Sequence, residues 1–116
     1  MAKKTTLDII VRYNNFPKLL KQIPDEVDAI VQKTALNIEA RAKTKAPVRT
    51  GFLKNSIRAV NTGTGRAEVR VGAHYGVYVE YGARGRPPRP YLTPAAREEE
   101  KVYIDTLSNL EKFLKS

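Results

Sequence analysis

The chain has 116 residues, of which 41% are hydrophobic and 28% charged, and its formal net charge is +9. This length predicts one domain, residues 1–116, with a modest core, and the composition argues against global disorder. The sequence contains no cysteine, which excludes disulfides and thiolate zinc sites. It also contains no apolar run of the roughly 18 residues that a membrane helix needs.

The first half predicts a strand, a short helix and a long helix. Residues 7–13 are rich in β-branched side chains and predict the strand, and residues 16–23 predict the short helix. A helix over about residues 25–45 has acids in its first turn, and Pro47 ends it. Its apolar stripe recurs at steps of three and four residues: Val27, Ile30, Val31, Ala35, Ile38 and Ala42.

The middle of the chain predicts a hairpin. Residues 48–57 read as a turn followed by a short helix or an extended piece. Residues 57–60 and 66–71 read as two strands, because residues 61–65 between them are Asn, Thr and Gly, which suit a tight hairpin loop. Alternation in the second strand puts three apolar residues on one face: Ala67, Val69 and Val71.

The last third predicts two helices joined by a loop. Residues 75–81 fit a strand or a short helix, and the three-residue spacing of the tyrosines favours the helix. Residues 82–92 are expected to form an Arg/Pro-rich loop, because prolines and glycines prevent a regular element. Thr93 as N-cap begins a helix over about residues 94–114. Together these elements predict an α+β fold, with both long helices packed on a small, mainly antiparallel sheet.

The basic residues are concentrated in two windows without acids. Residues 40–67 hold seven lysines and arginines, and residues 81–97 hold Arg84, Arg86, Arg89 and Arg97. Such windows suit contact with nucleic acid or with an acidic protein partner, and they also suit the solvation of a small basic protein.

The residue patterns of common catalytic and metal sites are absent from the sequence. His74 is the only histidine, and neither Ser56 nor Ser108 lies in a nucleophile-elbow motif. Glu80 lies alone among tyrosines, and we expect it to be buried and paired with a loop arginine rather than to act as an acid or base. We therefore expect no enzyme activity, no metal and no cofactor.

Four short motifs occur in a fixed order along the chain. They are Ala-Lys-x-x-Ala-Pro-Val (42–48), Arg-Thr-Gly-x-Leu-x-x-Ser-Ile (49–57), Val-Gly-x-x-Tyr-Gly-x-Tyr-Val-Glu-Tyr-Gly (71–82) and Arg-Pro-Tyr-Leu-Thr-Pro-Ala (89–95). Their order and spacing resemble the small neck, or head–tail connector, proteins of long-tailed bacteriophages and prophages, which are often labelled minor tail or tail-completion proteins. The resemblance covers about residues 25–100.

The resemblance implies a virion structural protein, made in the host cytoplasm, without catalysis. Its copies would form a ring between the head-closure or portal complex and the tail tube or tail terminator, and the genome would pass through the ring. It also implies structural roles for the motif residues Pro47, Thr50, Gly51, Leu53, Ser56, Tyr75, Tyr78, Glu80, Gly82, Pro90 and Pro94.

The Arg/Pro-rich loop is the expected contact surface. Arginine and tyrosine are enriched at interface hot spots, and prolines reduce the entropy lost on docking. We predict that four residues face a neighbouring subunit or DNA: Arg84, Arg86, Arg89 and Tyr91. The alternative is a small basic module that binds nucleic acid, with tyrosines stacking on bases and arginines holding phosphates; DNA contact in a ring would be non-specific and salt-sensitive.

Overall fold

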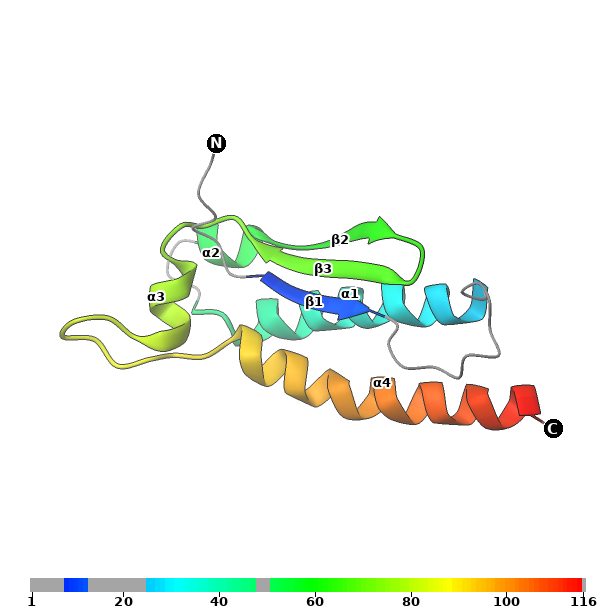
Figure 1. The fold of residues 1–116 in the computed structure, drawn as a ribbon. Helices are drawn as coiled ribbons and strands as arrows, with labels where there is room; N and C mark the ends of the chain where they lie inside the picture. Colours follow the sequence, from blue (N-terminus) through cyan, green and yellow to red (C-terminus); the bar gives the residue numbers. More distant parts are fainter. Residues whose placement is uncertain (1–7, 13–24, 48–50, 116) are drawn as a thin grey trace.

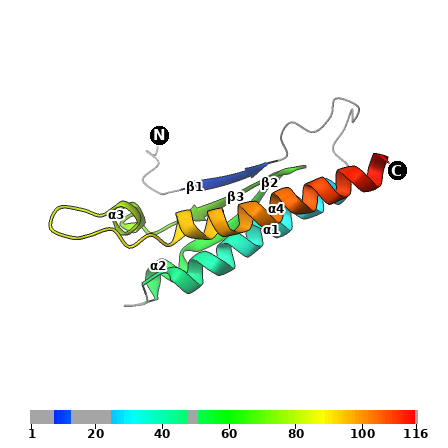
Figure 2. The same cartoon turned by 90° about the horizontal axis from the view of Figure 1, so that it is seen from below.

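The computed structural model describes residues 8–12, 25–47 and 51–115. In chain order the elements are β1 (Asp8–Arg12), α1 (Asp25–Lys45), α2 (Phe52–Asn55), β2 (Ile57–Gly63), β3 (Arg66–Val71), α3 (Gly76–Tyr81) and α4 (Leu92–Lys115). The three strands form an antiparallel sheet in the order β1-β3-β2. Helix α1 covers one face of this sheet and α4 lies along α1 (Figures 1 and 2). The predicted α+β class is confirmed.

Most of the predicted elements are present. The long helix has the expected limits, and the ambiguous tyrosine segment is helical as α3. Strand β2 continues to Gly63, beyond the predicted end at Val60, because Asn61 and Gly63 still pair with β3 across an irregular step. Helix α4 begins at Leu92, two residues before its predicted start. The helix predicted at residues 16–23 lies outside the described residues.

The core lies between the sheet and α1. Alternation along β3 buries the predicted apolar face and leaves Arg66, Glu68 and Arg70 on the opposite face. The apolar stripe of α1 packs onto the buried face of β3, which carries Ala67, Val69 and Val71. The start of α4 closes one end of the core. The fully buried larger side chains come from five parts of the fold: Val27, Val31, Ile57, Val69, Val71, Tyr91 and Leu92.

Polar side chains of α1 hold the β2–β3 hairpin. Asp28 Oδ1 accepts a hydrogen bond from the Gly65 amide at 2.7 Å, and Gln32 Nε2 donates to the Arg66 carbonyl at 2.8 Å. Glu39 Oε1 accepts from the Ala59 amide at 2.6 Å. Because β2 is an edge strand, the Glu39 contact satisfies an edge amide that would otherwise be open to pairing with another chain.

Ion pairs join α1 to α4 and neutralise part of the first basic window. Arg41 contacts both Glu98 and Glu99 at 2.7 Å, and Lys45 contacts Glu98 at 2.7 Å. Glu99 is buried and also accepts a hydrogen bond from Asn37. Arg41 and Lys45 are therefore neutralised by acids of the same chain. The arginines of residues 82–90 are more available than these two for contact with a partner.

Candidate functional site

Residues 82–90 form a projecting loop, which we call the arm (Figure 1). Ala83 and Arg86 exchange two backbone hydrogen bonds, of 3.1 and 2.8 Å, and these close a tight turn. Gly85 within that turn has φ of +79°, which a glycine adopts without steric strain. Residues 83–90 are all exposed. The arm is thus a structured projection with internal hydrogen bonds, and its side chains face solvent.

Glu80 fixes the two ends of the arm to each other. Glu80 is 2% exposed, and its carboxylate accepts hydrogen bonds from the amides of Tyr91 (3.0 Å), Leu92 (2.9 Å) and Thr93 (3.0 Å). The Leu92 and Thr93 amides are the first of α4, and the Tyr91 amide comes directly before them. Amides at the start of a helix lack partners within the helix and carry its positive dipole end. Since Glu80 precedes the arm and the three amides follow it, this one carboxylate closes the base of the arm.

The pKa of Glu80 reflects this contact. Burial raises the pKa, but the hydrogen bonds from Thr93 and from the backbone amides of Leu92 and Tyr91 outweigh it, so the pKa lies below 4.5. The predicted partner, a loop arginine, was wrong: the carboxylate is bonded to the N-terminus of α4. An anion at a helix start is stabilised without an opposing side-chain charge.

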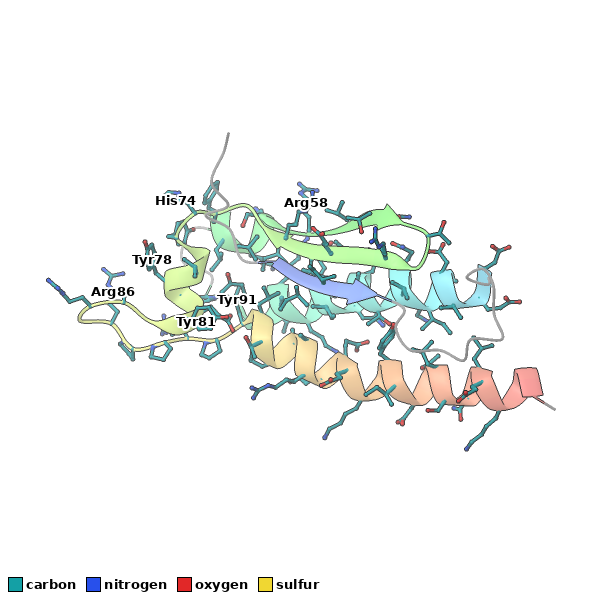
Figure 3. The ribbon with its side chains drawn as sticks, viewed as in Figure 1. Arg58, His74, Tyr78, Tyr81, Arg86 and Tyr91 are labelled. Carbon is teal, nitrogen blue, oxygen red and sulfur yellow. The ribbon has the colours of Figure 1, made fainter. Side chains whose placement is uncertain are left out.

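Tyr91 is also part of the base of the arm. The prediction that it faces a neighbour or DNA was wrong, because its side chain is fully buried. Its hydroxyl donates a hydrogen bond to the Gly76 carbonyl at 3.0 Å, and burial raises its pKa. A Cβ at Gly76 would lie 2.7 Å from that hydroxyl, so the glycine allows the close approach. In Figure 3 Tyr91 lies between α3 and the start of α4.

A groove of about 840 Å³ lies between the arm, α3 and α2. Phe52 and Tyr75 stack on one side, with ring centroids 6.1 Å apart, and Tyr78 adds a third aromatic ring. Phe52 is 58% exposed and Tyr78 59%, which is unusual for large apolar rings. Arg86 and Arg89 line the arm side of the groove. Figure 3 shows Tyr78 and Arg86 pointing away from the body of the molecule.

The groove brings together residues from all four sequence motifs, since Arg89 of the last motif also lines it. Pro47, Gly51, Leu53, Tyr75 and Tyr78 all line it. Phe52 also lines the groove, but it was not among the site residues predicted from the sequence. Its position as an aromatic residue next to Gly51, within a motif of turn residues, was a signal that it could be exposed for contact.

The other motif residues have local structural roles or lie outside the groove. Ser56 donates a hydrogen bond to the Leu53 carbonyl at 2.7 Å and ends α2. Gly82 has φ of +87° where α3 ends and the arm begins. Pro90 is exposed in the arm, and Pro94 lies in the first turn of α4. Thr50 lies outside the described residues.

The arm and groove are equipped for binding, by apolar contact and by positive charge. Within residues 8–12, 25–47 and 51–115, no carboxylate pairs with Arg84, Arg86 or Arg89. Over the same residues there is no group of three or more His, Asp or Glu side chains that suits a metal ion. His74 is exposed and meets the Tyr75 ring edge-on. No helix among the described residues is long and apolar enough to cross a membrane.

Comparison with known protein families gives a match. A family model described as "Bacteriophage HK97-gp10, putative tail-component" matches residues 13–82. No curated protein and no solved structure matches the chain at a significant level. The matched range includes the motifs around Pro47, Gly51 and Tyr75, and it ends where the arm begins.

Proposed function

The chain belongs to the HK97-gp10-like family of bacteriophage tail components, and we propose that its copies form a ring in the head–tail connector. In this role the protein is a structural part of the virion that helps to join or complete the tail. Its neighbours are the head-closure or portal proteins on one side and the tail-tube or tail-terminator proteins on the other, and the genome passes through the ring.

The observation that carries this proposal is the arm with its groove. A closed ring of identical subunits needs a heterologous interface, in which one patch of each copy meets a different patch of the next. Exposed aromatic rings lie beside arginines that pair with no carboxylate in the described part of the chain, and this is the composition of an interface hot spot. The arm is held at its base by Glu80, so little of its conformational freedom is lost on docking.

Self-association of the purified protein tests the ring. We expect light scattering to give a mass that is a multiple of the 13.0 kDa chain, and electron microscopy to show closed rings. The measurement is made over a range of protein concentrations, and again with the neighbouring connector proteins and tails present. Monomers alone under all of these conditions would contradict the proposal.

A second candidate function, binding of nucleic acid, is favoured by the outer face of the sheet. Arg58 of β2 lies directly opposite Arg70 of β3, and the exposed Arg66 lies on the same face at the other end of β3. Like charges opposite each other destabilise a sheet, although Glu68 pairs with Arg70 at 2.9 Å. An anionic partner such as DNA would relieve this repulsion. The basic face could then line the channel of the ring, or it could serve a protein that binds nucleic acid independently of a ring. A gel-shift experiment at low salt tests it: binding must appear there and weaken steeply as salt rises.

A further inference from the structure

Glu39 closes the middle of one edge of the sheet, the edge formed by β2 (Figure 1). The Ala59 amide donates a hydrogen bond to Glu39 Oε1 at 2.6 Å, so this amide points away from β3. In an antiparallel ladder every second residue points the same way, so Ile57 and Asn61 also turn their main-chain groups outward. Within the described residues, Ala59 is the only one of these three whose outward amide is bonded.

The Glu39 carboxylate occupies the position that an added strand would need. A strand that paired with β2 would place a carbonyl oxygen about 2.9 Å from the Ala59 amide, and the carboxylate oxygen is already there. Lys43, one turn further along α1, holds the carboxylate in place, with its Nζ 2.9 Å from Glu39 Oε2. The edge is therefore blocked by a side chain of the same chain, which a single substitution removes.

The surface around this edge suits contact with another chain. β2 contains no proline, and Arg58 is its only charged residue, so the strand has few of the usual features that prevent pairing. Leu36 of α1 is 57% exposed. It follows Gln32 by four residues and precedes Glu39 by three, and both of these bond to the β2–β3 hairpin. Leu36 therefore lies on the side of α1 that faces the hairpin.

We propose that the β2 edge is a pairing surface for β2 of a second copy, and that Glu39 keeps this surface closed in the free protein. The paired strands run antiparallel about Ala59, so that the Ala59 amide of each copy donates to the Ala59 carbonyl of the other. In this register Arg58 lies opposite Val60 of the second copy, so no like charges are directly opposite each other. Both α1 helices lie on one face of the joined sheet, which puts the two exposed Leu36 side chains on that face.

A pair of this kind is a product that ring assembly has to avoid. A two-fold pair joins the same surface of both copies, whereas copies in a ring all point the same way and join two different surfaces. Pairing through β2 would therefore hold one of the two copies in the wrong orientation for the ring. This consequence rests on the proposed ring, but the blocking of the edge by Glu39 does not.

Mixed disulfides test whether Glu39 blocks the edge, because the chain has no natural cysteine. Arg58→Cys and Val60→Cys are each introduced into a Glu39→Ala chain, and the two proteins are mixed and oxidised. In the proposed register these positions have Cα atoms about 4.5 Å apart, which a disulfide can bridge. We expect at least about tenfold more of the mixed two-chain product than in the same mixture with Glu39 intact, because the central hydrogen bonds between the strands can then form.

Three further variants separate the hydrogen bond from the charge. Glu39→Ser removes the carboxylate in a second way and should also open the edge. Glu39→Gln keeps an oxygen that accepts from the Ala59 amide, and Lys43→Ala leaves Glu39 in place, so both should stay closed. Circular dichroism checks that each variant is folded.

The outcomes for the edge and for the ring are distinguishable. Folded Glu39→Ala and Glu39→Ser proteins that give only the level of mixed disulfide seen with Glu39 intact would overturn the inference and leave the ring proposal in place. A Glu39→Gln protein that pairs as readily as Glu39→Ala would also overturn it. If the wild type forms no rings but Glu39→Ala opens the edge, the ring is wrong and the blocking by Glu39 is right.

Discussion

Replacing Glu80 with alanine is expected to lower the free energy of unfolding by about 3 kcal/mol, because three amides at the start of α4 lose their acceptor and each unsatisfied buried donor costs about 1–3 kcal/mol. In a domain of this size such a loss lowers Tm by roughly 10 °C. Chemical denaturation and calorimetry measure the two quantities. Glu26→Ala, which removes an exposed carboxylate from α1, is the matched control and should change Tm little.

The charge of Glu80 can be separated from its shape by Glu80→Gln and pH. The pKa of Glu80 lies below 4.5 in the folded protein, so its ionised form stabilises the fold above the unfolded pKa. This contribution is lost as pH falls through the folded pKa. The stability gap between the wild type and Glu80→Gln should therefore be widest above about pH 4.5 and narrow below it. Two results would contradict the proposal that the Glu80 carboxylate holds the base of the arm together. One is a Glu80→Ala variant as stable as the wild type, and the other is a stability difference between the wild type and Glu80→Gln that does not change with pH.

The double substitution Arg86→Glu with Arg89→Glu is expected to weaken assembly strongly without unfolding the chain. Both side chains are exposed and form no ion pair within the described residues, so Tm should be close to that of the wild type. Two reversed charges at an interface cost about 3 kcal/mol or more, which weakens self-association by roughly a hundredfold. Sedimentation velocity over a concentration series measures the loss.

A charge-matched control separates the arm from a general effect of net charge. Arg58→Glu with Arg66→Glu makes the same change on the outer face of the sheet. This control should assemble as the wild type does. If the arm variant also assembles normally, or if it unfolds, the division between a folded base and a binding arm is wrong.

The helices and the hairpin could be predicted because their signals are local. The three- and four-residue recurrence from Val27 to Ala42 fixes the buried face of α1, and the glycines near residue 63 allow the reversal between β2 and β3. Alternation alone identified the buried face of β3. In each case the physical cause acts within a few residues, where a sequence pattern records it.

The base of the arm could not be predicted because its contacts depend on the tertiary fold. Glu80 reaches amides 11 to 13 residues further along the chain, and Arg41 reaches Glu99 across 58 residues. Nothing in the sequence near Tyr91 shows whether its ring is buried at the base of the loop or exposed to a partner. The groove likewise joins Phe52 to Tyr75, and only the packing of α2 beside α3 brings these rings together.

The connector role is tested most directly by imaging phage particles produced without this protein. If it is the structural component that joins or completes the tail, the lysate should contain filled heads and unattached tails, and wild-type protein supplied in trans should restore joined, infectious particles. The variant with Arg86→Glu and Arg89→Glu should fail to restore them. Normal infectious particles formed in the absence of the protein would contradict the connector role.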